Sequence, residues 1–94
     1  MRRAARTDAS QQMIVEALKK IGANPVFIGK PLDLLVGYRG RNILLEVKNA
    51  REGHKQGELT QAQEEFMASW PGEAHIVNSI EEAISKVVGE LYVR

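Results

Sequence analysis

The sequence predicts one α/β domain in which helices pack on a mixed β-sheet. The 94 residues are 44% hydrophobic and 27% charged, which is typical of a globular chain and not of a disordered one. Helix-type and strand-type hydrophobic periods follow one another along the chain. A helical segment separates the last two strand-type segments, which favours a parallel crossover inside the sheet. We therefore expect residues 1–94 to form a single domain with the element order α-β-β-β-α-β-α.

Each expected element is recognised by its hydrophobic period and by the residues that end it. Gly22 can end the first helix, and a turn at Arg39-Gly40 joins the two longer strands into a hairpin. Thr60 and Gln63 have the spacing of a capping box at the start of the second helix. The expected elements are a helix at 8–21, strands at 26–28, 32–37 and 42–49, a helix at 59–70, a strand at 74–77 and a helix at 79–92.

Charge is distributed unevenly between the two halves of the chain. Residues 1–55 hold 11 Lys and Arg against 5 Asp and Glu, whereas residues 56–94 hold 2 against 7. A basic half is typical of a chain with a face for an anionic partner, although a segregated, solvated surface explains the pattern as simply. We expect a flexible basic arm at residues 1–7 and a mobile basic loop at residues 50–58.

Composition excludes several classes of protein and site. No apolar run approaches the roughly 20 residues that cross a bilayer, and no apolar stretch follows the basic start of the chain. We therefore expect no membrane span and a cytoplasmic location. The absence of cysteine rules out disulfides and thiolate zinc sites, and two histidines are too few for a histidine cage. Any bound metal must take oxygen ligands.

The predicted hairpin places three charged residues on one face of the sheet. Symmetric closure about Arg39-Gly40 sets Asp33 directly opposite Glu46. Because side chains alternate along a strand, Lys48 shares the face of Glu46 and Asp33. The opposite face receives the apolar side chains of Leu32, Leu34, Val36, Ile43, Leu45 and Val47.

Opposed carboxylates need a compensating charge. Directly opposite residues have Cβ atoms about 5 Å apart, so Asp33 and Glu46 would repel each other. A divalent cation between them removes the repulsion, and Mg²⁺ commonly binds one or two carboxylates together with water and phosphate. The alternative is an exposed strand face on which Lys48 pairs with one of the two acids. The spacing leaves both interpretations open.

The same residues carry a resemblance to a known family. Asp33 followed by Glu46-Val47-Lys48 resembles the Asp…Glu-x-Lys signature of the PD-(D/E)XK nuclease superfamily. The segment DLLVGYRGRNILLEVKN is most similar to small virus-type replication-repair nuclease (VRR-NUC) domains and to phage Holliday-junction resolvase-like proteins. The resemblance covers most of the chain and implies a restriction-endonuclease-like core. It is also carried by Arg6-x-Asp8-x-x-Gln11, Gly22, Leu59-Thr60-x-x-Gln63-x-x-Phe66, Trp70-x-Gly72 and Ile76-Val77-x-Ser79.

Two positions depart from the family pattern. The tripeptide Pro31-Leu32-Asp33 stands where the superfamily usually has Pro-Asp, so Asp33 is matched by its distance from Glu46. The first helix has Gln11 where resolvase-like members usually have a glutamate. Asp8 and Gln11 remain open as the residue that completes the site, and both rank above Glu16, which lies away from the apolar stripe of the helix.

The resemblance implies a metal-dependent endonuclease. Its substrates would be branched DNA, such as Holliday junctions and flaps, in replication, recombination or repair. Asp33, Glu46 and the backbone carbonyl of Val47 would bind Mg²⁺ or Mn²⁺. Lys48 would orient the attacking water and stabilise charge that develops on the phosphate. Gln63 matches a family glutamine near the site, although capping the helix explains it equally well.

DNA binding is expected to depend on exposed cations and not on base reading. Such cations contact phosphates whatever the base sequence. The aromatic residues are scattered and are expected mostly in the core or in turns. The candidate phosphate-binding residues are Arg2, Arg3, Arg6, Arg51 and Lys55. The alternatives to an endonuclease that acts by itself are a non-catalytic nucleic-acid-binding module and a nuclease subunit of a larger assembly, both with the same fold.

A homodimer is expected on grounds of size and apolar surface. A chain of 94 residues has a thin core. The helix expected at 79–92 carries more apolar residues than one sheet face needs, which indicates an association surface. These residues are Ile84, Val87, Val88 and Leu91.

Overall fold

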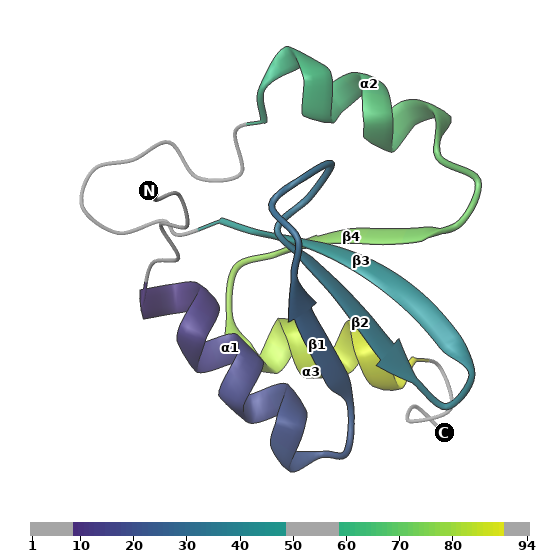
Figure 1. Ribbon diagram of the computed structural model, residues 1–94. Coiled ribbons are helices and arrows are strands. Elements are labelled where there is room, and N and C mark those ends of the chain that lie inside the picture. The colour runs from purple at the N-terminus through teal and green to yellow at the C-terminus, as the bar shows by residue number, and fades with distance from the viewer. Residues whose placement is uncertain (1–8, 49–58, 90–94) are drawn as a thin grey trace.

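A computed structural model describes residues 9–48 and 59–89 of the chain (Figure 1). Within these ranges the elements are α1 (Ala9–Lys20), β1 (Asn24–Phe27), β2 (Leu34–Tyr38), β3 (Arg41–Val47), α2 (Gln61–Ser69), β4 (Glu73–Val77) and α3 (Ile80–Val88). The basic arm predicted at residues 1–7 and the whole loop predicted at 50–58 lie outside them.

The four strands form one mixed sheet in the order β1-β2-β3-β4. β1, β2 and β3 pair antiparallel, and β3 pairs parallel with β4. The mixed sheet predicted from the sequence is therefore confirmed. The hairpin register is also as predicted, because Leu34 pairs with Leu45 and Val36 with Ile43. The turn at Arg39-Gly40 has φ angles of 50° and 82°, the left-handed values that two-residue hairpin turns favour.

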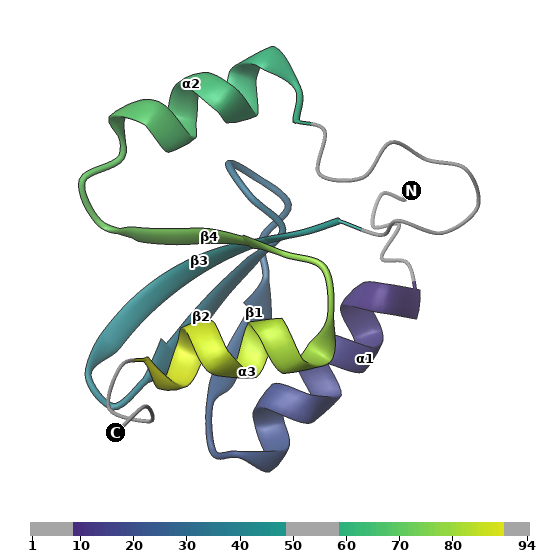
Figure 2. The ribbon, with the colours of Figure 1, turned by 180° about the vertical axis from the view of Figure 1, so that it is seen from behind.

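The helices lie on both faces of the sheet. Figures 1 and 2 show α1 and α3 together on one face and α2 alone on the opposite face. The hydrophobic core lies between the sheet and the α1–α3 layer, where the alternate residues of β2 and β3 point. It contains Ile14, Val15 and Leu18 of α1, Leu34, Val36, Ile43, Leu45, Val47 and Val77 of the sheet, and Ala83 and Val87 of α3.

The ends of the helices agree with the sequence signals. At the start of α2 the Thr60 side chain accepts a hydrogen bond from the Gln63 backbone N–H, and the Gln63 side chain accepts one from the Thr60 N–H, each at 3.1 Å. The predicted capping box is therefore confirmed. Gly22 follows α1 with a φ of 91°, a conformation that glycine adopts without strain.

Two expectations need correction. The first concerns β2, which begins at Leu34 and not at Leu32, because the Asp33 carbonyl accepts hydrogen bonds from the N–H groups of Ile28 and Gly29 at 3.0 and 3.2 Å. These bonds close the β1–β2 connection into a loop just before β2.

The second concerns the apolar surface of α3. Val87 is fully buried, and Ile80 and Ile84 pack against the core. These side chains complete the α1–α3 layer, whereas Val88 is half-buried and is not part of the core cluster. The apolar surface that the described part of this helix leaves for a dimer is therefore smaller than expected. Leu91 lies outside the described residues.

Candidate functional site

β3 brings Glu46 to the face of the sheet on which α2 lies. Ile43, Leu45 and Val47 point into the core, so the alternate residues Leu44 and Glu46 point the other way. β3 is flanked by β2 on one side and by β4 on the other. In this central position the Glu46 residue is only 5% exposed. Among the residues that the structure describes, Glu46 is the one charged residue that is buried.

Asp33 lies beside Glu46, at the base of the β1–β2 loop. The last paired residues of the hairpin are Leu34 and Leu45, so Asp33 and Glu46 occupy the next position. The Oδ2 atom of Asp33 accepts a hydrogen bond from the Val47 N–H at 2.8 Å. The carboxylate of Asp33 is therefore held against the backbone of the residue that follows Glu46.

The third residue, Lys48, forms an ion pair with Glu46. Its Nζ atom lies 3.3 Å from Oε2 of Glu46. Pairing of Lys48 with one of the two acids was expected if the hairpin holds no metal. The other oxygen, Oε1, is buried and has no hydrogen-bond partner. A buried polar atom without a partner costs about 1–3 kcal/mol, and more when the group is charged. Lys48 therefore satisfies only half of the Glu46 carboxylate.

The carboxylate oxygens of Asp33 and Glu46 fit a hard divalent cation that takes only a few of its ligands from the protein. Asp33 and Glu46 supply carboxylate oxygens, and the unpartnered Oε1 is a free ligand atom within the site. Within the described ranges, no group of three or more His, Asp or Glu side chains is arranged to hold a metal. Two carboxylates are nevertheless sufficient for Mg²⁺, which usually keeps several waters and binds substrate phosphate. A site that relies on three or four protein side chains, as zinc does, is not formed by these residues.

The weaker site candidates divide into described and undescribed residues. Gln63 is engaged in the capping box, so its side-chain oxygen has a structural function at the start of α2. Gln11 lies half-buried in the first turn of α1, and Glu16 is exposed further along the same helix. Asp8 lies outside the described residues. The participation of Gln11, Asp8 and the Val47 carbonyl in metal binding stays a prediction.

The predicted phosphate-binding residues all lie outside the described ranges; they are Arg2, Arg3, Arg6, Arg51 and Lys55. Sequence reasoning missed Lys30, an exposed lysine in the β1–β2 loop that Asp33 closes. The available signal was its place between Gly29 and Pro31, two turn-forming residues close to the carboxylate motif.

The aromatic residues are more exposed than expected. Trp70 is 43% exposed at the end of α2 and stacks on Phe66, with ring centroids 5.0 Å apart. Phe27 on β1 is also exposed. The expectation that these side chains lie in the core or in turns is therefore wrong for Phe27, because β1 is an edge strand without a neighbour on its outer side.

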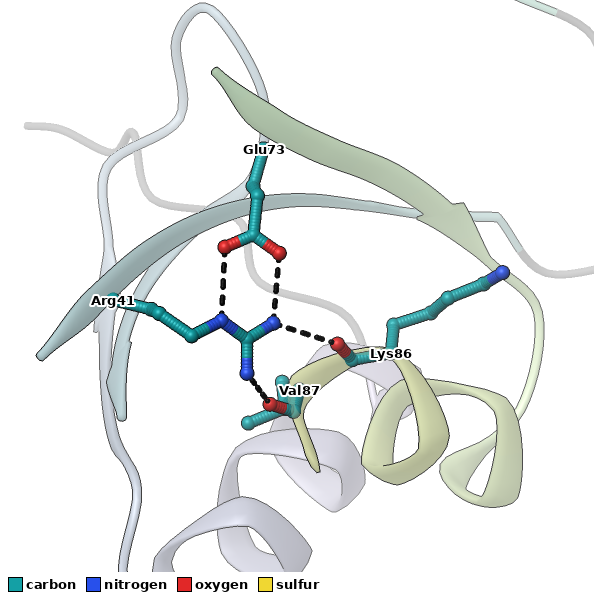
Figure 3. A network of polar contacts seen from close by, with 4 residues as sticks. All are labelled: Arg41, Glu73, Lys86 and Val87. Carbon is teal, nitrogen blue, oxygen red and sulfur yellow. Dashed lines mark hydrogen bonds and ion pairs between the residues drawn. The ribbon is translucent and has the colours of Figure 1, made fainter. Parts of the chain in front are cut away.

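A second polar cluster lies on the other side of the sheet, and the sequence did not indicate it (Figure 3). Arg41 donates two hydrogen bonds to the Glu73 carboxylate, at 3.0 and 2.7 Å, and two more to the carbonyls of Val87 and Lys86. The hydrogen bond from Arg41 lowers the pKa of Glu73. Nearby on β4, burial lowers the pKa of His75, and the positive charge of Lys86 adds to the effect. This cluster fastens α3 to the sheet.

Comparison with protein families, with curated proteins and with solved structures finds no match to this chain. No helix in the described ranges has both the length and the apolar character to cross a membrane.

Proposed function

We propose that this protein is a metal-dependent DNA endonuclease that hydrolyses phosphodiester bonds in branched DNA. The observation that carries the proposal is the buried Glu46 carboxylate, which has one oxygen without a partner and lies beside Asp33 and Lys48. A strand as apolar as β3 gains nothing structurally from such a group. The resemblance of Asp33, Glu46 and Lys48 to the PD-(D/E)XK signature supports the same conclusion, and with it a restriction-endonuclease-like core.

Each residue of the site has a distinct role in this proposal. Asp33 and Glu46, with the Val47 carbonyl, hold Mg²⁺ or Mn²⁺. When bound, the ion polarises the scissile phosphate and lowers the pKa of a coordinated water. Lys48 places a positive charge where the phosphate gains negative charge during attack, which is an interaction that strengthens in the transition state. The hydrogen bond from Val47 fixes the orientation of Asp33 before substrate binds.

The working unit in this proposal is a homodimer, because two symmetry-related sites can act on the two equivalent strands of a four-way junction. Most apolar residues of the described part of α3 pack in the core, so we do not place the interface there. A nuclease subunit that acts within a larger assembly needs the same site residues and is tested by the same variants.

A second candidate is a non-catalytic module that binds nucleic acid. The Glu46–Lys48 ion pair favours it, because that contact gives the carboxylate a partner without any metal. Such a module binds branched DNA equally well with and without divalent cations and cleaves none of it.

A cleavage panel distinguishes these functions. Labelled four-way junctions, flaps, splayed arms and plain duplex are incubated with the protein in Mg²⁺, in Mn²⁺ or in a chelator. We expect cleavage of branched substrates only when a divalent cation is present. Asp33→Asn, Glu46→Gln and Lys48→Ala should each lower the rate about a hundredfold or more, because each removes charge that acts at the phosphate. Asparagine keeps an oxygen that can accept the Val47 hydrogen bond, so the first variant preserves the local fold.

The matched control is Glu81→Gln, which neutralises an exposed carboxylate of α3 in the opposite layer. It should cleave at the wild-type rate. Wild-type rates in all three site variants, or DNA binding without cleavage in any cation, would contradict the endonuclease proposal.

A further inference from the structure

The β1–β2 loop, residues 28–33, lies on the same side of the sheet as α2. Figures 1 and 2 both show it rising from the sheet toward α2 and away from the α1–α3 layer. Its base is closed by the two hydrogen bonds to the Asp33 carbonyl, and the Asp33 side chain is held by Val47. The loop and the carboxylate site therefore share a residue, and the position of one determines the position of the other.

Lys30 differs from the other cations of the described ranges. Lys19 and Lys20 on α1 and Lys86 on α3 belong to the layer on the opposite face. Arg41 is bound to Glu73, and Lys48 to Glu46. Lys30 is exposed, and no ion pair of its side chain is found among the described residues.

Arg39 is also exposed but lies at the wrong end of the hairpin. Its turn is separated from Glu46 by six residues of β3, which corresponds to about 20 Å along the strand. Lys30 is three residues from Asp33, so their Cα atoms are at most about 11 Å apart. Successive phosphates of one DNA strand are spaced about 3.4 Å along the helix axis. A strand with one phosphate at the carboxylate site thus presents further phosphates within the reach of Lys30.

We propose that Lys30 binds the DNA backbone, at a phosphate next to the one held at Asp33 and Glu46. This inference rests on the proposed function, which it extends by naming a substrate-binding residue. The cation offsets the negative charge that two carboxylates bring to the same face. It fixes the path of the strand without reading its sequence, because a contact to a phosphate oxygen carries no sequence information.

The test is a binding measurement that does not depend on cleavage. Fluorescence anisotropy of a labelled flap DNA is measured with the full chain in a chelator, at salt concentrations from about 50 to about 200 mM. One phosphate contact contributes a slope of about 0.9 to the dependence of log affinity on log salt. Lys30→Ala should therefore bind more weakly at low salt, and its deficit relative to wild type should shrink about threefold across this range.

Two further variants make the result specific. Lys30→Arg keeps the charge and should retain most of the affinity. Lys20→Ala removes an exposed lysine from the α1 layer and should behave like the wild type. In cleavage, Lys30→Ala should raise KM while kcat at saturating DNA stays within about twofold of wild type, because the residue binds substrate outside the reacting atoms.

The outcomes separate this inference from the proposed function. If Lys30→Ala matches Lys20→Ala in both affinity and salt dependence while the wild type cleaves DNA, Lys30 is a solvated surface residue and the endonuclease proposal stands. If the wild-type chain binds no DNA at any salt concentration, either in the chelator or with a divalent cation present, both are overturned. A circular dichroism melting curve for each variant confirms that the fold is intact before binding is compared.

Discussion

The two oxygen atoms of Glu46 have different surroundings. Oε2 faces the Lys48 ammonium at 3.3 Å, whereas Oε1 is buried without a partner. A buried ion pair repays its desolvation only when the remaining lone pairs are also satisfied. The free energy of the metal-free protein is therefore raised at this one side chain, and a cation that binds Oε1 lowers it.

Glu46→Gln should separate structural from metal-binding roles. Without divalent cations we expect its melting temperature to equal or exceed that of the wild type, because the substitution removes a buried charge. Mg²⁺ or Mn²⁺ should raise the melting temperature of the wild type and leave the variant unchanged. A cation at 100 times its dissociation constant adds about 2.7 kcal/mol to the free energy of unfolding. Differential scanning fluorimetry with and without chelator measures both effects.

Lys48→Ala provides the comparison for this prediction. It removes the partner of a buried carboxylate and should destabilise the metal-free protein, in the opposite direction to Glu46→Gln. Glu81→Gln should change the melting temperature little and should leave its response to cations as in the wild type. A marked loss of stability in Glu46→Gln, with no cation effect in the wild type, would show that the ion pair is structural.

At the scale of elements, the Arg41 cluster connects β3, β4 and α3. The guanidinium group binds Glu73 through two nitrogens and also caps carbonyls at the end of α3 (Figure 3). The pair is partly exposed, so solvent reduces its contribution to about 1 kcal/mol. The pKa of Glu73 is lowered on folding, chiefly by the hydrogen bond from Arg41.

This shift predicts how stability depends on pH. A carboxyl group with a lowered pKa stabilises the fold above its unfolded pKa, which is about 4.3, and the stabilisation is lost as pH falls through the lower folded value. Glu73→Gln should therefore be less stable than wild type at pH 7 by about 1 kcal/mol, and the difference should shrink in acid below about pH 4. Urea unfolding at a series of pH values measures it. Glu65→Gln, on exposed α2, is the control, and a difference that stays constant with pH would contradict the assignment.

α2 is the helix that depends least on the core. None of its residues is buried, in contrast to α1 and α3. Local stability in a protein follows the burial that each segment contributes. The capping box stabilises the start of this helix independently of the core.

Hydrogen exchange should reveal this difference. We expect the amides of α2 to exchange at least tenfold faster than those of β2 and β3, because α2 opens without disrupting the core. Thr60→Ala should accelerate amide exchange in α2 further, because it removes a cap worth about 1 kcal/mol. Amide exchange in β3 should stay the same. Equal protection of α2 and β3 would show that the helix unfolds only with the whole domain.

At the scale of the whole molecule, the two faces of the sheet differ in chemical character. The α1–α3 layer holds the hydrophobic core, and the α2 face holds Asp33, Glu46 and Lys48. The charged side chains on the α2 face therefore take no space from the hydrophobic core. The edge strand β1 carries the exposed apolar residues Val26 and Phe27.

The predicted homodimer is tested by mass. Light scattering at micromolar concentration should give about twice the 10.5 kDa of the chain, because a small core gains stability from association. Since Ile80, Ile84 and Val87 of α3 already pack in the core, Val88→Ser should leave the mass unchanged. Val26→Lys places a charge on the exposed edge strand β1 and should lower the mass toward that of one chain if this strand forms the interface. A mass near 10.5 kDa at all concentrations, with single nicks on junctions, would leave the dimer without support.

Local patterns determined much of the fold. The alternation of apolar residues in β2 and β3, the Arg39-Gly40 turn and the Thr60–Gln63 capping box all act between residues close in sequence, so their structural consequences could be predicted. The placement of Asp33 beside Glu46 followed from the same hairpin register.

Only the tertiary structure decided the environment of these residues. Glu46 is buried because β3 lies between β2 and β4, and that order depends on a crossover through α2. The Arg41–Glu73 contact joins residues 32 positions apart, which no local spacing indicates. The apolar residues of α3 suggested a dimer until the α1–α3 layer showed where they pack. Periodicity determines which face of an element is apolar, whereas the surface that covers that face depends on how distant segments pack.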